Sequence, residues 1–239
     1  TGNRVIVNRE RIFMEEDGIV LAGGYVKGST SVTLAVAPSA AFSVGNLVQF
    51  TQDDSPNVWG PGIGVYIRSG HPGKWGMSAS RNLRFTSRIT SITGNTIGLA
   101  TPIPISFDGT LNPKAYPLRN GPPTSLCGVE DLTIVGGSAT DRAVSWSGAD
   151  RCWIKGVEAF NITGGHGAIY IEDGLQCEIR RCYIHDCPNY PAQADGYGMS
   201  LYYGCSHCLV EDNITYRLGC GIGMLGASAN ALLYNYDLL

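Results

Sequence analysis

The stretch Cys177-Glu178-Ile179-Arg180-Arg181-Cys182-Tyr183-Ile184 carries the pattern that decides the fold of this chain of 239 residues. Its first cysteine belongs to a series with steps of 25, 25, 31 and 23 residues: Cys127, Cys152, Cys177, Cys208 and Ala231. Two residues after each of these positions comes an apolar residue: Val129, Ile154, Ile179, Val210 and Leu233. A period near 25 residues, with short apolar strands and glycine-rich corners, predicts a solenoid of stacked coils.

A second strand follows in each predicted coil. Because successive side chains of a strand point to opposite faces, one series of residues is expected inside and its neighbours outside. The residues expected inside are Ile134, Ala159, Ile184 and Thr215. The residues expected outside are Val135, Phe160, His185 and Tyr216. This register puts an aromatic ring on each side of His185.

The first half of the chain does not share this period. Residues 1–24 contain two short strands and are predicted to form an N-terminal coil of the solenoid. Residues 25–118 contain a hairpin turn at Thr93-Gly94-Asn95 and are predicted to form an inserted antiparallel barrel or sandwich-like module. Residues 119–239 return to coils. The coil that starts at Asn230 has no apparent cap, so we expect further coils in a longer protein or self-assembly through this coil.

The composition favours a turn-rich β-protein and excludes some functions. Glycine is abundant at 32 residues, and charged residues make up only 15%. The net charge of −3 and the absence of a long Lys/Arg run argue against binding to nucleic acid or to an anionic membrane. No apolar stretch approaches the roughly 20 residues that a membrane span needs. Eight cysteines favour an oxidising compartment, so a secreted, extracellular protein is predicted.

Segments in both halves of the chain resemble a known superfamily. The coils, such as Val129-Glu130-Asp131-Leu132-Thr133-Ile134, resemble the right-handed parallel β-helix proteins of the pectate-lyase-like superfamily. The segment from Phe42 to Phe50, with that from Ile89 to Leu99, looks like a β-module inserted near the N-terminus of some secreted bacterial β-helix proteins. The resemblance implies an all-β fold, a right-handed parallel β-helix with a small inserted antiparallel module. The superfamily includes polysaccharide lyases, glycoside hydrolases, phage tailspikes and adhesins, so the resemblance does not assign a reaction.

One break in the period suggests where chemistry is located. The step between Cys177 and Cys208 is longer than the others, and an insertion in one coil forms a loop beside the outer face. His185 and Asp186 come immediately before the extra residues, and His166 lies in a glycine-rich turn one coil earlier. Coils stack about 4.8 Å apart, so side chains in one column can reach one another. One such column is predicted to hold Asp141, His166, Tyr197 and Cys220.

His166 and His185 are expected to converge at this corner, and their side chains suit acid/base chemistry on a sugar polymer. A polysaccharide lyase needs a base and a cation that stabilises the developing charge. His185 or His166 is the candidate base, and the candidate cation is Arg180, Arg181, Arg217 or a bound Ca²⁺. A glycoside hydrolase needs two carboxylates across the scissile bond, here Asp186 and Asp195, with Glu172 and Asp173 as substitutes. The candidate substrate-binding residues are Phe160, Arg180, Tyr190, Tyr197 and Tyr216.

Structural roles are the alternative for each candidate. An outward histidine is often a plain surface residue, aspartates cap turns, and Arg180 with Glu211 forms a surface ion pair of little consequence. Cys187 and Cys220 lie near corners of adjacent predicted coils and are candidates for a disulfide. The leading functional prediction is an extracellular protein that binds and cleaves a polysaccharide as a lyase or a hydrolase. The alternative is a non-catalytic adhesin, a tailspike-like fibre or a surface filament protein.

Overall fold

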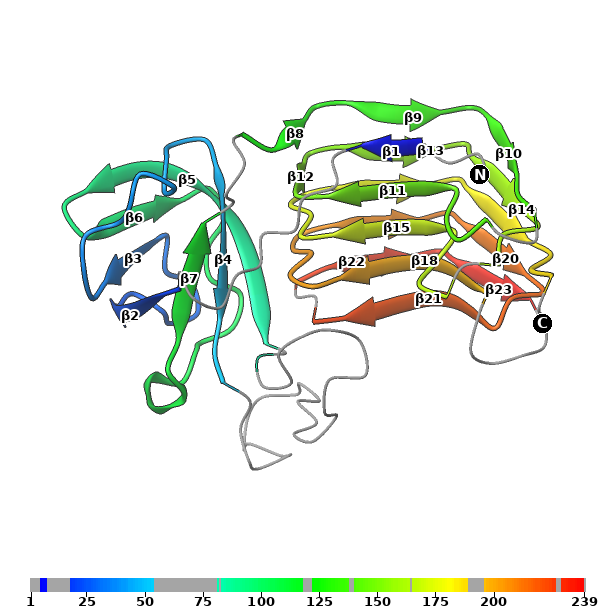
Figure 1. Ribbon diagram of the computed structural model, residues 1–239. Coiled ribbons are helices and arrows are strands. Elements are labelled where there is room, and N and C mark those ends of the chain that lie inside the picture. The colour runs from blue at the N-terminus through cyan, green and yellow to red at the C-terminus, as the bar shows by residue number, and fades with distance from the viewer. Residues whose placement is uncertain are drawn as a thin grey trace. The chain divides into compact units, whose positions relative to one another are not determined.

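The computed structural model describes residues 5–7, 18–53, 81, 83–117, 122–137, 140–163, 165–188, 196–226 and 229–238. The chain forms two compact units, one made of Thr1–Arg11 with Pro123–Leu239 and the other of Ile12–Pro122. The first unit is a parallel β-helix, and the second contains a closed antiparallel barrel (Figure 1). The predicted all-β fold, a parallel β-helix with an antiparallel module, is therefore confirmed.

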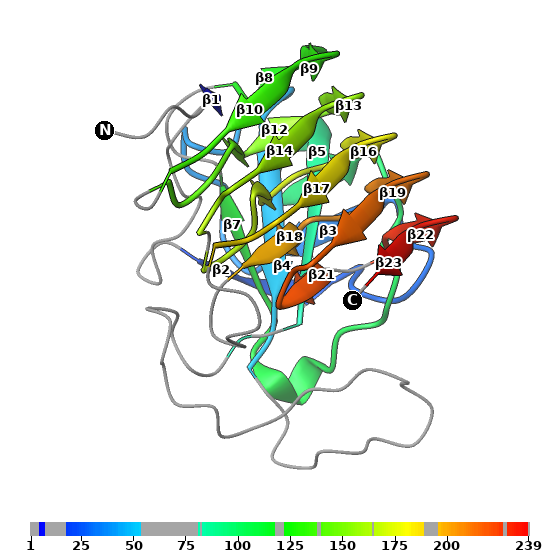
Figure 2. The ribbon, with the colours of Figure 1, turned by 90° about the vertical axis from the view of Figure 1, so that its right-hand side faces the viewer.

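Three parallel sheets, each with five described strands, form the walls of the β-helix (Figures 1 and 2). The β15 sheet contains β1 (Val5–Val7), β11 (Val144–Ser147), β15 (Ile169–Glu172), β18 (Tyr197–Tyr202) and β21 (Cys220–Leu225). The β16 sheet contains β9 (Gly128–Glu130), β13 (Trp153–Lys155), β16 (Glu178–Arg180), β19 (Leu209–Glu211) and β22 (Ala231–Leu233). The β17 sheet contains β10 (Thr133–Val135), β14 (Glu158–Phe160), β17 (Tyr183–His185), β20 (Ile214–Tyr216) and β23 (Tyr236–Leu238). A short pair, β8 (Thr124–Ser125) and β12 (Ala149–Asp150), lies beside them.

The predicted register of the β17 sheet is confirmed. The four residues expected inside are register partners on successive strands, and all four are buried: Ile134, Ala159, Ile184 and Thr215. Their outward neighbours form the expected outer column, in which His185 lies between Phe160 and Tyr216. Strand alternation on a repeating backbone therefore sorts these side chains correctly.

Single residues in the left-handed conformation turn each coil from one sheet to the next. The corner between the β16 and β17 sheets holds one such residue in every described coil, with φ between 50° and 59°: Asp131, Gly156, Arg181, Asp212 and Tyr234. The left-handed conformation costs a residue other than glycine roughly 1–2 kcal/mol, so the surrounding structure must stabilise the other four residues of this column. These corners explain why consecutive strands, only a few residues apart, belong to different sheets.

Near the last described coil, asparagines take positions that cysteines occupy in earlier coils, and their side chains bond from one coil to the next. Asn230 occupies the position after Cys208, and its side chain accepts a hydrogen bond from the Cys208 amide at 2.8 Å. At the next corner, Asn213 is fully buried and bonds to Asn235 of the following coil at 2.9 Å. The prediction for this last coil is wrong by one residue, because Leu232 and not Leu233 pairs with Val210. The reason is that Asn230, not Ala231, takes the cysteine position and satisfies the backbone there.

The second unit is a six-stranded barrel in the order β2-β3-β6-β5-β4-β7. Its described elements are β2 (Ile19–Gly23), β3 (Ser31–Leu34), β4 (Leu47–Thr51), β5 (Arg84–Thr93), β6 (Thr96–Leu99), the 3₁₀ helix η2 (Gly109–Leu111) and β7 (Lys114–Pro117). The predicted hairpin turn connects β5 to β6, and the connection consists of Gly94 and Asn95 because Thr93 belongs to β5. Phe50 and Phe85 stack in its core with ring centroids 5.9 Å apart.

One strand prediction near the N-terminus is corrected. Residues 1–24 were expected to form a single coil, and β1 does pair with β11 of the β-helix. Strand β2, however, pairs with β3 and β7 of the barrel. The physical reason is Leu21, whose side chain is buried in the barrel core. A short apolar strand by itself does not reveal which sheet it joins.

The last described coil exposes apolar side chains. Leu232, Tyr234, Tyr236 and Leu238 are between 46% and 72% exposed. A pocket of about 430 Å³ lies among this coil and its neighbours, and Asn213, Thr215 and Asp237 contribute to its lining. Self-assembly through this coil stays a prediction. Within the described residues, no helix is long and apolar enough to cross a membrane.

Candidate functional site

His185 is the last residue of β17, at the place where the chain leaves the sheet. The next residue, Asp186, has a left-handed backbone with φ of 50°. The predicted insertion follows, but residues 189–195 lie outside the described part of the chain, and so do the candidates Tyr190 and Asp195. The site is therefore built from the strands on which His185, its neighbours and the other candidates lie.

Two aromatic rings stack on the His185 imidazole. Phe160, its register partner on β14, lies with its ring centroid 5.0 Å away and its plane tilted by 18°. Tyr183, two residues earlier on the same strand face, lies 4.1 Å away with a tilt of 20°. The His185 side chain is only 12% exposed, whereas Tyr183 is 37% exposed. The stack therefore buries the imidazole and presents the tyrosine to solvent.

Two carboxylates contact the two nitrogens of the same imidazole. Nδ1 of His185 lies 2.8 Å from Asp186 Oδ2, and Nε2 lies 3.3 Å from Glu158 Oε1. Arg217 contacts the other Asp186 oxygen at 3.1 Å, and Thr133 donates a hydrogen bond to Glu158 at 2.9 Å. When both carboxylates are ionised, only the imidazolium form of His185 can donate to both of them. The histidine thus holds two acidic side chains at fixed positions on adjacent coils.

These groups form one exposed surface on the β17 sheet. We call it the ring-and-carboxylate surface, and it consists of Glu158, Phe160, Tyr183, His185, Asp186 and Arg217. The charged side chains of Glu158, Asp186 and Arg217 are 41%, 43% and 54% exposed. The surface thus combines an aromatic face, two carboxylates that accept hydrogen bonds and one guanidinium.

His166 does not join this surface. Its ring makes edge contacts with Tyr170 at 6.2 Å and with Tyr202 at 6.3 Å, both on the outer side of the β15 sheet. The prediction that His166 and His185 converge is therefore wrong. His166 lies in the turn just before β15, whereas His185 is the last residue of β17, which belongs to a different sheet.

A buried polar cluster surrounds the His166 contacts. The Tyr170 hydroxyl donates to Glu172 Oε2 at 2.5 Å, and the Arg142 guanidinium lies over the Tyr170 ring at 3.8 Å from its centroid. Tyr170 and Glu172 are 2% and 4% exposed. Burial, followed by the nearby Glu172 carboxylate, raises the pKa of Tyr170 well above its ordinary value. This cluster is a packed hydrogen-bonded unit in which Tyr170 stays protonated.

The remaining substrate-binding candidates lie in different places. Arg180 lies on β16, not on the β17 sheet, and its guanidinium contacts Glu211 at 2.5 Å and Glu178 at 3.4 Å. The left-handed corner at Arg181 separates it from His185, so the ion-pair alternative describes Arg180 correctly. Tyr197 pairs with Cys220 across β18 and β21, as predicted. The predicted column is wrong by one residue at its previous step, because Ile169 pairs with Met199 and His166 is therefore not the register partner of Tyr197. Tyr216 follows His185 in the outer column of the β17 sheet.

The predicted Cys187–Cys220 disulfide is not formed, because all eight cysteines are free thiols. Cys187 is buried in the β-helix core, whereas the half-buried Cys220 thiol donates to the Ile222 carbonyl at 3.5 Å. Burial raises the pKa of Cys152 to about 12 and that of Cys182 to about 11. The thiols of the column thus behave as small packed groups.

Among the described residues, no group of three or more His, Cys, Asp or Glu side chains could hold a metal ion. Two residues of the surface, Glu158 and Tyr183, were not among the site residues predicted from the sequence. They are register partners on β14 and β17, and extending the outward column by two residues would have found them.

Comparisons with known proteins give a likeness of fold. No protein-family model matches the chain. No curated protein matches it. Among solved structures, the chain is similar to the tailspike gp61 of Pseudomonas phage phi297, with 15% identity and a TM-score of 0.57 over 93% of this chain and 34% of that one. At this identity the likeness shows the fold alone, and the chain spans about a third of the length of that tailspike.

Two further tailspikes match more weakly. The tailspike gp49 of Pseudomonas phage LKA1 has 14% identity and a TM-score of 0.49, over 91% of this chain and 33% of that one. The tailspike Gp54 of Acinetobacter baumannii bacteriophage AP22, in complex with A. baumannii capsular saccharide, has 13% identity and a TM-score of 0.39, over 92% of this chain and 45% of that one. Membership of the pectate-lyase-like superfamily stays a prediction.

Proposed function

We propose that this chain is a polysaccharide-binding β-helix segment of an extracellular, tailspike-like protein. In this proposal the sugar chain is bound on the ring-and-carboxylate surface of the β17 sheet. The observation that carries the proposal is the stack of Phe160, Tyr183 and His185 flanked by exposed carboxylates. The fold shared with a phage tailspike supports it as a likeness of architecture.

The surface has the two kinds of group that a sugar needs. A sugar ring has apolar C–H faces that pack on an aromatic ring, and Tyr183 offers a partly exposed one. Sugar hydroxyls donate hydrogen bonds to carboxylates, and Glu158 and Asp186 are fixed by His185 before a ligand arrives. Such preorganisation lowers the entropic cost of binding, because these side chains are already ordered. Arg217 adds a cation for an acidic sugar.

Binding is supported better than cleavage by the contacts of His185. A lyase needs a neutral imidazole with a free nitrogen that can remove a proton. Both ring nitrogens of His185 face carboxylates, and its side chain is 12% exposed. The imidazole is therefore engaged as a support for its neighbours rather than open to a substrate.

Cleavage is the second candidate function, and one observation favours it. Glu158 and Asp186 are two carboxylates on opposite nitrogens of one imidazole, which places a pair of acidic groups on adjacent coils. A glycoside hydrolase uses such a pair as acid and as base or nucleophile. In a lyase, Arg217 would instead neutralise the carboxylate of an acidic sugar. Asp195 remains a candidate from the inserted segment.

The binding proposal is tested with a panel of acidic and neutral bacterial polysaccharides, measured by affinity electrophoresis and isothermal titration calorimetry. We expect at least one polysaccharide to bind, and Tyr183→Ala to weaken that binding by about tenfold or more. Tyr234→Ala is the matched control, because Tyr234 is 72% exposed and lies outside the surface. Equal binding by the Tyr183→Ala variant and the wild type would place the sugar elsewhere.

The cleavage candidate is tested by mass spectrometry of the same polysaccharides after incubation with the chain, with and without Ca²⁺. Unsaturated fragments indicate a lyase, and fragments that have gained water indicate a hydrolase. Either product should disappear in Asp186→Asn and Glu158→Gln, which keep the side-chain shape but remove the charge. Intact polysaccharide that is nevertheless bound would support the binding function alone.

A further inference from the structure

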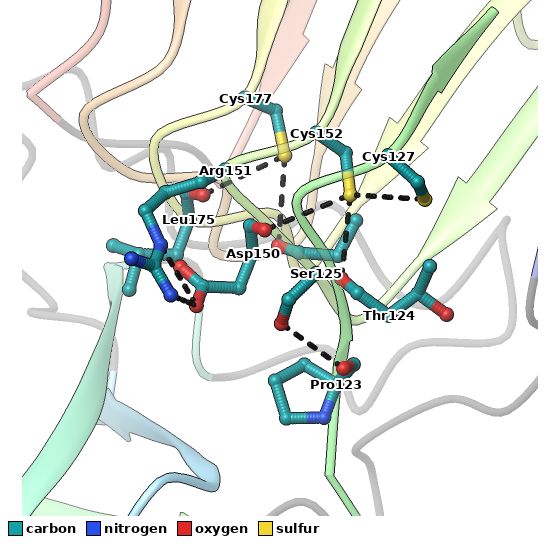
Figure 3. A network of polar contacts seen from close by, with 10 residues as sticks. Pro123, Thr124, Ser125, Cys127, Asp150, Arg151, Cys152, Leu175 and Cys177 are labelled. Carbon is teal, nitrogen blue, oxygen red and sulfur yellow. Dashed lines mark hydrogen bonds and ion pairs between the residues drawn. The ribbon is translucent and has the colours of Figure 1, made fainter.

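The first two cysteines of the column lie close together across adjacent coils. The sulfurs of Cys127 and Cys152 are 3.7 Å apart. The two cysteines come immediately before β9 and β13, and Figure 3 shows their sulfurs next to each other with Cys177 further along the column. The Trp153 amide donates to the Cys127 carbonyl at 3.1 Å, so the backbones at the two cysteines are held in register. This pair was not a disulfide candidate in the sequence.

The backbone spacing at this pair suits a disulfide. Paired strands lie about 4.8 Å apart, and the usual Cα separation of a disulfide is about 4.4–6.8 Å. The Cys152 thiol at present donates to the Thr124 carbonyl at 3.3 Å, a contact seen in Figure 3. Closing the disulfide requires the Cys152 thiol to leave this carbonyl and turn toward the Cys127 sulfur, 3.7 Å away.

We propose that Cys127 and Cys152 are a redox pair that closes an inter-coil disulfide by exchange with a small disulfide such as glutathione disulfide. The Cys127 thiolate attacks one sulfur of the small disulfide, and the first glutathione thiolate leaves. The Cys152 thiolate then attacks the Cys127 sulfur of the mixed disulfide and releases the second glutathione. The protein loses two electrons and two protons, and the small disulfide becomes two thiols.

Exposure assigns the order of these two steps. Cys127 is half-buried at the first described coil, whereas Cys152 is 1% exposed. A dissolved disulfide therefore reaches Cys127 first. The buried Cys152 then acts as the resolving thiol. Burial raises the pKa of Cys152 to about 12, which makes the second step the slower one near neutral pH. Cys177, the next in the column, is 1% exposed and donates instead to the Ala149 and Leu175 carbonyls.

The bond would fasten the coil that carries β8 and β9 to the coil that carries β12 and β13. The two cysteines are 25 residues apart, so the disulfide would close a loop about one coil long. Closing such a loop reduces the freedom of the unfolded chain. For a chain of this size we expect the Tm of the β-helix to rise by about 5–10 °C.

The test exposes the folded chain to glutathione disulfide and maps the linked peptides by mass spectrometry without reduction. We expect a peptide that joins Cys127 to Cys152, with the rise in Tm reversed by dithiothreitol. Cys127→Ser should abolish both the linked peptide and the rise. Cys220→Ser is the matched control, because Cys220 is the other half-buried cysteine, and this variant should respond like the wild type. A stable glutathione adduct on Cys127, or a link from Cys127 to another cysteine, would overturn the proposal.

Discussion

Phe160 and His185 are register partners on adjacent coils, and their rings stack with centroids 5.0 Å apart and planes tilted by 18°. The parallel in-register backbone produces this contact, because equivalent outward positions repeat at the spacing of paired strands, about 4.8 Å. The stack fixes the imidazole, and the imidazole in turn holds Asp186 and Glu158. Ring packing and the position of the acidic groups are therefore one coupled arrangement.

This coupling can be measured by a double-mutant cycle with Phe160→Ala and His185→Ala. Because the rings contact each other directly, we expect the two changes in unfolding free energy to be non-additive by about 0.5–1.5 kcal/mol. The measurement is urea unfolding of the wild type, the two single variants and the double variant. Additivity within about 0.3 kcal/mol would show that the stacked geometry carries no interaction energy.

Asn213→Ala should be among the more destabilising polar substitutions in the β-helix. The Asn213 side chain is fully buried, accepts from the Cys182 amide at 2.9 Å and donates to the Ile179 carbonyl at 3.0 Å. Removing it leaves buried backbone groups unpaired, so we expect a loss of about 2–4 kcal/mol in denaturant unfolding. Asn235→Ala is the control at the less buried end of the same ladder, and its loss should be smaller. Equal losses would mean that burial does not set the cost.

The left-handed corner column predicts opposite results for two substitutions. Gly156 has φ of 59°, and a Cβ at this position would lie 2.3 Å from Asp131 Oδ1, so Gly156→Ala should destabilise the fold by about 1–2 kcal/mol. Arg181 occupies the same corner one coil later with φ of 53° and a solvent-exposed side chain. Arg181→Gly should be neutral or stabilise by up to about 1 kcal/mol, because it relieves the left-handed strain. Thermal and urea unfolding of both variants checks the contrast.

Alkaline pH should destabilise the β-helix through its buried thiols. In the unfolded chain a cysteine loses its proton near pH 9, whereas burial raises the pKa of Cys182 to about 11 in the folded chain. Between pH 9 and 11 the unfolded chain therefore binds fewer protons than the folded chain. Raising the pH in this range favours the unfolded chain. The contribution of Cys182 to the unfolding free energy should be constant below pH 9 and should fall between pH 9 and 11.

Cys182→Ala isolates the contribution of this thiol. We expect the pH dependence of this variant between pH 9 and 11 to be shallower than that of the wild type by up to about 1.4 kcal/mol per pH unit. The readout is urea unfolding at a series of pH values. An unchanged slope would mean that the Cys182 proton is not linked to folding.

Sequence reasoning succeeded for the β-helix because the determining signal is local and repeats. The inward series Ile134, Ala159, Ile184 and Thr215 follows from strand alternation and one period, and the structure confirms it. The same register correctly placed Phe160 and Tyr216 on either side of His185. Where a polar residue replaced cysteine, at Asn230, the alignment slipped by one residue, because hydrogen bonding there takes over the role of apolar packing.

The candidate site could be only partly predicted, because corners redirect side chains over very short stretches of chain. Arg180 and His185 are close in sequence, yet the left-handed turn at Arg181 puts them on different sheets. His166 was assigned to the site of His185 but contacts Tyr170 and Tyr202 on a third sheet. An alignment of the repeats predicts which residues stack, but it does not predict toward which sheet the side chain of a turn residue points.

The sequence by itself determined the period, the inward and outward faces and the antiparallel module, because these follow from side-chain alternation, spacing and turn chemistry along the chain. Only the tertiary structure decided that β2 belongs to the barrel, that the His185 ring contacts the Glu158 carboxylate, and that the Cys127 and Cys152 sulfurs lie 3.7 Å apart. The physical reason is that each of these contacts joins residues from different strands. Their approach depends on how the corners fold the chain in space, not on any single stretch of residues.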